Sequence, residues 1–440
     1  MTPYFLEQFM PEYMNYWFAV GLDKFIRVFW FFLFFEFFRY VVLEILVVIW
    51  YKVSRYLSRK KIALARKKLR IENPLISIIV PGKNEGRHLY KLVKSLNEQT
   101  YKNIELIIVD DGSNDATPII SRNLEKMGMV TKVLRNNQRG GKASAANLAC
   151  RFASSDIIVH LDADCSFDYD AIEQIILPMY MDRQIGAVGG NVKVRAFQKN
   201  LPSSLQAFEY LKIISVGRIT TATLGIYKII SGAFGAFRRE ALDACGGWDI
   251  GPGLDGDITV KIRKSDYKIA FEPAAVCLTS VCATFKKLSD QRLRWSKSLI
   301  RFRLRKHADI YLPHKGFKWS NFLALFENVL YNLGLNIFWI LYVIDLLTNF
   351  SSQLVSIILM NLTLYIVSGY IQLLTVLVLS ERPREESVLF LYVPLMPLYT
   401  GVFLRYVRTR AYLHELFWKM SYHDPWNPFK SSRQAKANNF

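Results

Sequence analysis

Acidic residues follow a short apolar run near the middle of this 440-residue chain. Asp162 and Asp164 come directly after Ile157–Leu161. Mg²⁺ and Mn²⁺ bind proteins through one or two carboxylates and complete their shell with water and phosphate oxygens. We therefore predict that Asp162 and Asp164 hold a divalent cation and that the substrate carries a diphosphate, as nucleotide diphosphates do. Alternating aspartates also cap helices, and for the motif in isolation this interpretation stays open.

Two further segments carry groups that suit a nucleotide. Asp110 and Asp111 follow the apolar run 105–109, and their carboxylates can accept hydrogen bonds from a base or from ribose hydroxyls. Gly140 and Gly141 supply flexible backbone ahead of Lys142, whose ammonium is a cation for phosphates. Together these segments predict a nucleotide pocket.

An acidic residue and a basic helix complete the candidate chemistry. Asp257 stands at the start of a predicted helix and is our candidate general base, because a hydroxyl that attacks a carbon must lose its proton to a nearby carboxylate. The segment 291–295 reads Gln-Arg-Leu-Arg-Trp, in which Arg294 can clamp a diphosphate and Trp295 can stack on a sugar ring. A helix cap at Asp257 and a membrane-adjacent basic helix are the alternatives.

The elements that must position these residues follow an alternating pattern. The runs 76–80, 105–109 and 157–161 are strand-like, each ends in a polar cluster, and amphipathic helical stretches separate them. This pattern predicts an α/β domain with a mostly parallel sheet covered on both faces. Ligands bind such sheets at the carboxyl ends of the strands, where the acidic residues stand.

Composition places this domain at a membrane. Hydrophobic residues make up 51% and aromatic residues 14% of the chain, more than a soluble core needs. The net charge is +20, but the sequence shows no zinc-ligand spacing, recognition-helix pattern or aromatic RNA motif. This argues against a nucleic-acid partner. The five cysteines show no metal or redox spacing, so we expect reduced thiols in the cytoplasm.

The N-terminal region predicts one membrane anchor. Residues 25–51 are long enough to cross a hydrocarbon core of about 30 Å. Glu36 and Arg39 lie three residues apart within it, where they can pair on one helix face. The basic run 52–70 follows and is typical of the cytoplasmic side, which places the N-terminus outside.

Three apolar blocks follow the α/β region, at about 318–344, 354–379 and 387–407. The first connecting loop lacks Lys and Arg, whereas the second carries them, so we expect the first outside and the second in the cytoplasm. Three crossings would put the C-terminus outside, yet the tail is basic. Pro394 and Pro397 mark the third block as the most probable exception to a straight crossing, and the side of the C-terminus stays open.

Taken in order, these motifs resemble the membrane-embedded family 2 glycosyltransferases, which include cellulose, chitin, hyaluronan and poly-N-acetylglucosamine synthases. The resemblance covers about residues 72–306, and order and spacing make it specific. The matching segments are Val80-Pro81-x-x-Asn84-Glu85, Val109-Asp110-Asp111-Gly112-Ser113, Gly141-Lys142-Ala143, Asp162-x-Asp164, Ser231-Gly232, Asp257 and Gln291-x-x-Arg294-Trp295.

The resemblance implies a GT-A fold, inverting transfer from a nucleotide sugar, and a processive enzyme that extrudes its product. It implies the following roles: Pro81, Asn84, Glu85, Asp110, Asp111, Lys142, Asp162, Gln291 and Arg294 at the nucleotide-sugar donor; Asp162 and Asp164 at Mg²⁺ or Mn²⁺; Asp257 as base; and Ser231, Gly232 and Trp295 at the acceptor. Family members usually carry an acidic residue where this chain has Gly256, so Asp255 substitutes for the lost partner or the acceptor pocket differs.

The predicted fold is thus a GT-A α/β domain inserted between transmembrane α-helices of an integral membrane protein. The predicted divisions are an anchor with basic linker at 1–70, the cytoplasmic GT-A domain at 71–290, an interfacial helix at 291–316, transmembrane or re-entrant helices at 317–410, and a basic tail at 411–440. We expect a multi-pass protein of the bacterial plasma membrane.

We expect the protein to polymerise a β-linked polysaccharide, with a nucleotide sugar, the growing polysaccharide, the lipid bilayer and an accessory export subunit as partners. Polar residues such as Glu327, Asn328, Asn332 and Asn336 are predicted to line a path for the product, with helix-to-helix contacts as the alternative. A non-processive enzyme that adds one sugar to a lipid carrier and a catalytically silent scaffold are the competing hypotheses.

Overall fold

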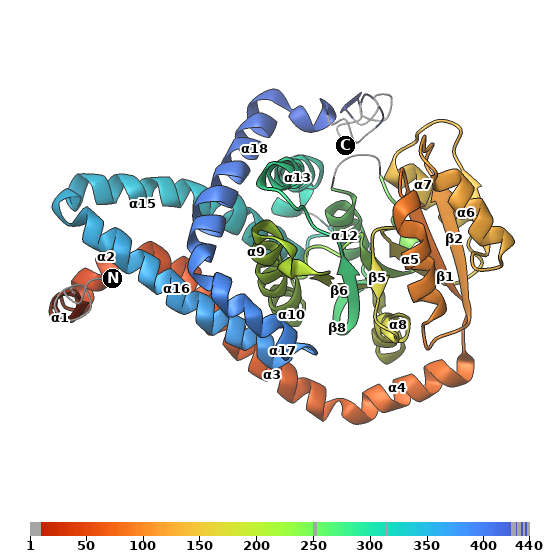
Figure 1. The fold of residues 1–440 in the computed structure, drawn as a ribbon, viewed down its shortest axis with the longest axis horizontal. Helices are drawn as coiled ribbons and strands as arrows, with labels where there is room; N and C mark the ends of the chain where they lie inside the picture. The colour runs from red at the N-terminus through yellow and green to blue at the C-terminus, as the bar shows by residue number, and fades with distance from the viewer. Residues whose placement is uncertain are drawn as a thin grey trace.

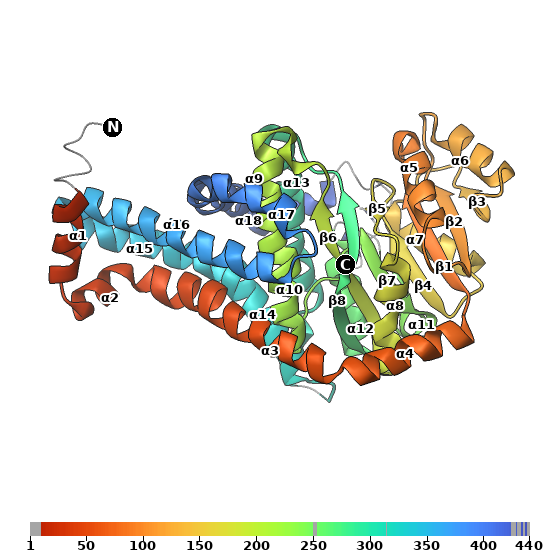
Figure 2. The same ribbon diagram turned by 60° about the horizontal axis from the view of Figure 1, so that its bottom comes forward.

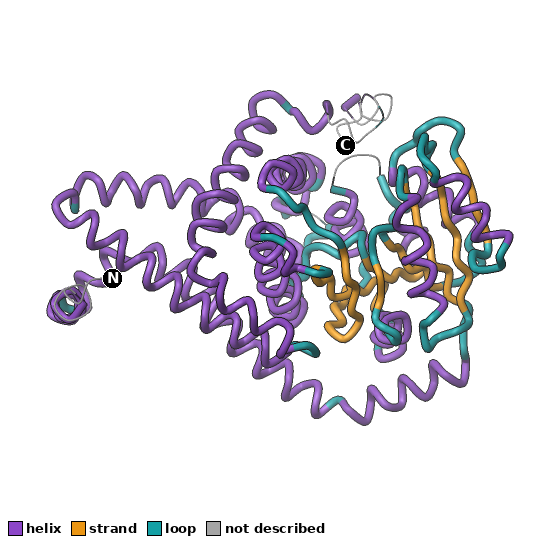
Figure 3. The backbone as a smooth tube through the Cα atoms, viewed as in Figure 1, coloured by secondary structure: helices purple, strands orange, loops and turns teal. Residues whose placement is uncertain are grey.

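The computed structural model describes residues 10–249, 253–313 and 315–423, with residues 428, 433, 436 and 437. A domain built on one sheet lies at one end, and long helices extend away from it on the other side (Figures 1 and 3). The strands of that sheet are β1 (Ile76–Gly82), β2 (Ile104–Asp110), β3 (Lys132–Arg135), β4 (Ile157–Leu161), β5 (Ser166–Phe167), β6 (Ile185–Val194), β7 (Phe234–Arg238) and β8 (Lys268–Thr279).

The sheet has the strand order β3-β2-β1-β4-β7-β6-β8-β5. The three predicted strands are confirmed as β1, β2 and β4, and β1 pairs in parallel with both of the others. The prediction of a mostly parallel sheet is confirmed for the pairs β1–β2, β2–β3, β1–β4 and β6–β8, whereas β7 runs antiparallel between β4 and β6, and β5 runs antiparallel to β8. The domain is therefore an α/β domain with a mixed sheet.

Helices cover both faces of this sheet because the strands are apolar on both sides. In β1, Ile78 and Val80 pack in one core and Ile79 in the other, as the twofold alternation of a strand requires. The first core contains side chains of α5 (Gly86–Asn97), α6 (Thr117–Lys126) and α8 (Ala171–Met181). The second contains those of α7 (Lys142–Phe152), α11 (Arg239–Ala244) and α12 (Leu254–Lys264).

A helical layer separates the sheet from the long helices. It consists of η3 (Phe197–Lys199), α9 (Leu201–Tyr210), η4 (Leu211–Val216), α10 (Gly217–Thr223), α13 (Phe285–Ser298), η5 (Leu299–Lys306) and η6 (Ala308–Tyr311). The segment with Gln291 and Trp295 lies within α13, which begins at Phe285 with the side chain of Thr284 accepting a hydrogen bond from the Lys287 amide. This layer carries the predicted acceptor residue to the domain surface nearest the long helices.

Two helical runs after the domain are long and apolar enough to cross a membrane, namely Trp319–Asn349 and Ser351–Leu379. The first comprises α14 (Trp319–Val329), η7 (Leu330–Gly334) and α15 (Leu335–Asn349); the second comprises η8 (Ser351–Gln353) and α16 (Leu354–Leu379). With 26 residues, α16 alone extends about 39 Å at 1.5 Å per residue, which exceeds the hydrocarbon thickness.

The N-terminal region is helical but less apolar. It comprises α1 (Met10–Ala19), α2 (Leu22–Phe31), η2 (Phe32–Val42), α3 (Leu43–Leu57) and α4 (Arg59–Glu72), the last of which runs beside the domain to β1 (Figure 2). The anchor predicted at 25–51 is not among the candidate spans found in the described chain and stays a prediction.

Charged side chains in this N-terminal run find partners on other helices. The guanidinium of Arg39 lies 3.4 Å from a carboxylate oxygen of Glu44 and 3.3 Å from one of Glu327 in α14. Glu36 lies 3.7 Å from Arg405 rather than pairing with Arg39 as the sequence predicted. The nearer carboxylates satisfy Arg39, because packing against α14 brings Glu327 to it.

The third apolar block is bent and returns to the domain. Its two halves, Pro383–Leu395 and Pro397–Trp418, meet at 56° beside the two prolines singled out above. They comprise α17 (Pro383–Glu386), η9 (Ser387–Leu395), η10 (Pro397–Phe403) and α18 (Leu404–Trp418), with η11 (Met420–His423) after them.

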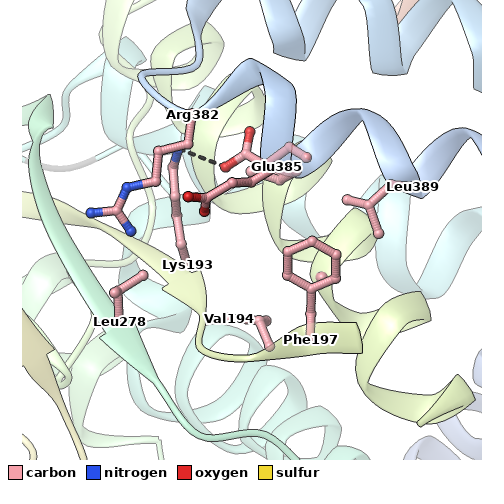
Figure 4. Close-up of a pocket in the computed structure, with 10 residues that line it drawn as sticks. Lys193, Val194, Phe197, Leu278, Arg382, Glu385 and Leu389 are labelled. Carbon is pink, nitrogen blue, oxygen red and sulfur yellow. Dashed lines mark hydrogen bonds and ion pairs between the residues drawn. The ribbon is translucent and has the colours of Figure 1, made fainter. Parts of the chain in front are cut away.

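Ion pairs tie both ends of this bent block to the domain. At its start, Glu386 lies 2.9 Å from Lys193 of β6, and Arg382 lies 2.5 Å from Asp168. Figure 4 shows Lys193 and Arg382 at this junction, beside a cavity of about 30 Å³. At its end, Glu415 lies 2.6 Å from Arg305 of η5. The block therefore leaves the domain and comes back to it.

The close packing of the central strands gives a stability prediction. A Cβ at Gly190 of β6 would overlap the ring of Phe234, whereas a Cβ at Gly401 has nothing within 4 Å. We expect Gly190→Ala to lower the free energy of unfolding by about 1–3 kcal/mol through overpacking. Gly401→Ala is the control and should leave stability unchanged or raise it slightly. Thermal unfolding in detergent checks both, and an unchanged midpoint for Gly190→Ala would contradict the packing described.

Candidate active site

The loops after β1 and β2 hold each other in place. Asn84, with a left-handed φ of 60°, donates its backbone N–H to Oγ of Ser113 at 2.8 Å. Its side-chain oxygen accepts the N–H of Asn114 at 3.1 Å. Gly82 pairs with Asp110 in the parallel register, so the two strand ends lie side by side. The predicted donor residues Pro81, Asn84 and Asp110 are thus brought to one sheet edge.

The two aspartates after β2 shape the loops around them. One oxygen of Asp110 accepts the N–H of Ser113 at 2.9 Å. The carboxylate of Asp111 accepts the backbone N–H of Gly140 at 2.8 Å and that of Gly141 at 2.7 Å. Gly141 has a φ of 91°, which a side chain would strain. Asp111 therefore fixes the turn that leads into Lys142, a role the sequence did not predict.

Lys142 and two acidic residues gather around Gly232. Nζ of Lys142 lies 2.5 Å from Asp162, and the two side chains are 34% and 35% exposed, so a substrate can reach them. A Cβ on Gly232 would lie 2.9 Å from Nζ of Lys142 and 2.5 Å from Oδ1 of Asp255. A side chain at position 232 would have to displace the ends of these two side chains, so a glycine lets Lys142 and Asp255 approach each other here.

The electrostatics of this cluster are dominated by crowded carboxylates. Burial and the neighbouring Asp162 raise the pKa of Asp164. Burial, together with Asp164 and Asp162, raises the pKa of Glu85 to about 7. Although burial opposes it, Lys142 lowers the pKa of Asp162, and Arg294 of α13 acts in the same direction. The strand edge therefore carries more negative charge than the side chains around it neutralise.

The acidic side chains at this strand edge suit a divalent cation that also binds a phosphate. No group of three or more His, Cys, Asp or Glu side chains suited to a metal occurs within the described residues. Mg²⁺ and Mn²⁺ at phosphate-binding sites need only one or two carboxylates, because substrate oxygens and water supply the other ligands. Asp162 and Asp164 provide such a pair, and the raised pKa of Asp164 indicates unneutralised charge beside it. The donor set fits the cation.

Asp255, and not Asp257, reaches the Lys142 cluster. Asp257 is 1% exposed, and its two oxygens lie 2.7 Å from Nζ of Lys306 and 2.7 Å from Nε2 of His307. Residues two apart on a helix point in different directions, so α12 presents only one of these carboxylates to the cluster. Burial raises the pKa of Asp255, and Lys142 opposes this effect. The geometry thus favours Asp255 over the base predicted from the sequence.

The segment Gln291–Trp295 lies on α13 with its aromatic residue exposed. The Trp295 side chain is 43% exposed, and the guanidinium of Arg292 lies 4.6 Å from its ring centre. Arg292 is also 2.8 Å from Glu209 of α9, a contact that bridges 83 residues of sequence. Arg294 lies near enough to Asp162 to lower its pKa. Glu209 is a site neighbour that sequence analysis did not single out.

Comparison with known proteins identifies the catalytic class of the domain. Residues 77–246 match the model for Glycosyl transferase family 2. Poly-beta-1,6-N-acetyl-D-glucosamine synthase of Staphylococcus epidermidis is 31% identical over 256 residues. The synthase of the same name from Staphylococcus aureus is 29% identical over 272 residues. These matches span 58% and 61% of this chain, and 61% and 63% of the relatives.

A solved structure supports the fold. The mannosyltransferase PcManGT of Pyrobaculum calidifontis, in complex with GDP-Man and Mn²⁺, superposes with a TM-score of 0.54 at 19% identity. The superposition covers 85% of this chain and 99% of that one. The domain therefore matches the family 2 glycosyltransferase model over residues 77–246 and has a GT-A-like fold, as the sequence motifs predicted.

The two aspartates of α12 give a discriminating prediction. Asp257→Asn should lower the free energy of unfolding by about 1–3 kcal/mol, because His307 would lose its buried carboxylate partner and Lys306 would keep only Asp249. Asp266→Asn is the control: its ion pair with Lys318 is exposed and should contribute less than about 1 kcal/mol. Thermal unfolding of both variants checks this. A fully stable Asp257→Asn variant without turnover would return Asp257 to the chemistry.

Proposed function

We propose that this chain, which carries a family 2 glycosyltransferase domain, is a processive polysaccharide synthase. It would transfer sugar from a nucleotide donor, a UDP-sugar in the first instance, to the end of a growing β-linked chain. The observation that carries the proposal is the convergence of Lys142, Asp162 and Asp255 around Gly232, with Arg294, on the helix that carries the exposed Trp295, near enough to lower the pKa of Asp162. The names of the staphylococcal relatives point to N-acetylglucosamine as the sugar to test first.

The donor would lie along the carboxyl ends of β1, β2 and β4. Pro81, Asn84, Glu85, Asp110 and Asp111 surround the place proposed for the nucleoside. Asp110 and Asp111 already accept hydrogen bonds from loop amides, so they act there partly by shaping the loops. Cationic groups are needed where a diphosphate departs, and Lys142 and Arg294 are proposed to supply them. Gln291 is proposed to line the same end.

A divalent cation is proposed between the domain and the diphosphate. Asp162 and Asp164 would hold Mg²⁺ or Mn²⁺, which when bound would neutralise charge on the leaving nucleoside diphosphate. The crowding that raises the pKa values of Asp164 and Glu85 supports this assignment, because an added cation relieves it.

Asp255 is proposed as the general base in place of Asp257. Its carboxylate lies by Gly232, at the acceptor side of Lys142, and its raised pKa brings it closer to the pH at which a base accepts protons efficiently. The acceptor hydroxyl would give its proton to Asp255 as its oxygen forms the bond to the anomeric carbon. The bond from that carbon to the diphosphate breaks at the same time.

The acceptor would be positioned by small residues and by one aromatic ring. Gly232 leaves space beside the base, and Ser231 forms the turn before it, its carbonyl accepting the N–H of Phe234 at 3.1 Å. The exposed indole of Trp295 offers a flat apolar face to a sugar. A product held at this end lies next to the helices that follow α13.

Extrusion through those helices is the part of the proposal with the least side-chain support. Glu327 pairs with Arg39 and Lys228, and Asn332 and Asn336 donate to backbone carbonyls four residues earlier, at 2.8 and 2.6 Å. Glu327, Asn332 and Asn336 are thus satisfied within and between helices, which favours the helix-contact interpretation for them, whereas the buried Oδ1 of Asn328 has no hydrogen-bond partner among the described residues. The catalytic domain is proposed to face the cytoplasm of a bacterial cell.

The base assignment is tested by Asp255→Asn. We expect donor turnover to fall by about 10²-fold or more, because loss of a general base costs this much, with thermal stability unchanged. The assay uses the purified protein in detergent with Mn²⁺ and a panel of donors beginning with UDP-N-acetylglucosamine, and it measures nucleotide release and product length.

Product length separates the competing hypotheses. Long polymer from one donor supports the synthase. A single transferred sugar would replace it by a lipid-carrier transferase, and no turnover with any donor would favour a scaffold. Wild-type activity in Asp255→Asn would overturn the base assignment alone.

A further inference from the structure

The indole of Trp295 lies against the guanidinium of Arg292, and buried side chains hold that guanidinium in place. The guanidinium of Arg292 lies 4.6 Å from the centre of the indole and 5.8 Å from the ring of Tyr210 in α9. The indole is exposed, whereas Arg292 is largely buried. The planar guanidinium is therefore in position to set the orientation of the ring that a sugar would meet.

One carboxylate oxygen holds this guanidinium and a second group. Oε2 of Glu209 accepts a hydrogen bond from Nη2 of Arg292 at 2.8 Å and another from the hydroxyl of Tyr399 at 2.7 Å. Glu209 and Tyr399 are both buried. Three segments far apart in sequence, α9, α13 and η10, thus meet at a single atom.

The carboxylate of Glu209 and the guanidinium of Arg292 each stabilise the charged form of the other. Burial alone would lower the pKa of Arg292, but the adjacent carboxylate of Glu209 raises it above its ordinary value. A buried guanidinium that keeps its charge is held firmly, because moving away from the carboxylate would leave two unpaired charges out of water. The Arg292 guanidinium is therefore restricted to positions close to the Glu209 carboxylate.

An aromatic contact joins the same two segments. Phe285, at the start of α13, packs edge-on against Phe403 of η10 with ring centres 5.3 Å apart. Phe403 stacks in turn on Tyr399. The helix that carries Trp295 is thus held to the bent C-terminal block at both the charged and the apolar contact.

We propose that Glu209 is a positioning residue for the acceptor: through Arg292 it orients the Trp295 indole, and through Tyr399 it fixes that indole relative to the C-terminal block. The inference rests on the proposed function only for the identity of the acceptor, a β-linked sugar chain. Glu209 would not touch the donor, so its loss should weaken acceptor binding selectively.

The test compares substrate constants in matched variants. In Glu209→Gln we expect the KM for a soluble β-1,6-linked N-acetylglucosamine oligosaccharide to rise about tenfold, since a charge-assisted hydrogen bond is lost. The KM for UDP-N-acetylglucosamine should stay within about twofold, because the contact does not reach the donor. Tyr399→Phe removes one hydroxyl and should raise the acceptor KM by about two- to fivefold.

Glu386→Gln is the matched control. It removes a buried carboxylate that also ties the C-terminal block to the domain, through Lys193 and not through Arg292. We expect it to lower the melting temperature without changing either KM. An equal rise of the acceptor KM in Glu386→Gln, or equal changes of both substrate constants in Glu209→Gln, would overturn the proposal in favour of a purely structural contact.

A binding measurement separates this proposal from the proposed function. Titration of the same oligosaccharide is followed by tryptophan fluorescence, with Trp295→Phe as the blank. Binding that weakens about tenfold in Glu209→Gln would sustain the positioning role even in a protein that makes no polymer. Binding that is equal in wild type and Glu209→Gln, or absent from both, would overturn the role whatever the activity.

Discussion

Repulsion between carboxylates at one sheet edge is the constraint on which the site depends. Parallel pairing of β1 with β2 and β4 brings Glu85, Asp162 and Asp164 together, and α12 adds Asp255. Lys142 counters part of this charge. A cationic ligand, whether a metal or a metal–diphosphate pair, would complete the balance. The fold therefore holds a binding site whose strain is relieved by the substrate it is proposed to receive.

The loops and helices next to this sheet edge hold it in place, and Trp295 of α13 remains exposed. Asp111 anchors the glycine turn before Lys142, and Asp257 anchors α12 to η5 through Lys306. These buried contacts use carboxylates for structure immediately beside carboxylates available for chemistry. Trp295, in contrast, remains exposed although the contacts beneath it are buried. Rigid support beneath an accessible surface is what a site needs to orient a mobile polymer end.

The sequence was sufficient wherever the chain itself carries the pattern. Apolar runs ending in Asp110 and Asp162 predicted the strands and their shared edge, because parallel strands align their ends. It does not separate Asp255 from Asp257, since only the rotation of α12 decides which carboxylate faces Lys142, and the choice of base remains a proposal. It also failed for the Glu209 contact, whose partners lie 83 and 190 residues away. The antiparallel β7 was missed because apolar alternation does not encode strand direction.

The bent C-terminal block bears on how membrane crossings are counted. Its start contacts β6 and its end contacts η5, so both ends lie on the side of the molecule where the domain is. With Trp319–Asn349 and Ser351–Leu379 as spans, the chain crosses an even number of times after the domain. With that count, the loop that contains Arg382 and Arg384 lies on the same side of the membrane as the basic tail. Both segments would then agree with the positive-inside rule. A block that bends by 56° between two ends on the same side of the molecule has the shape of a re-entrant segment rather than of a straight crossing.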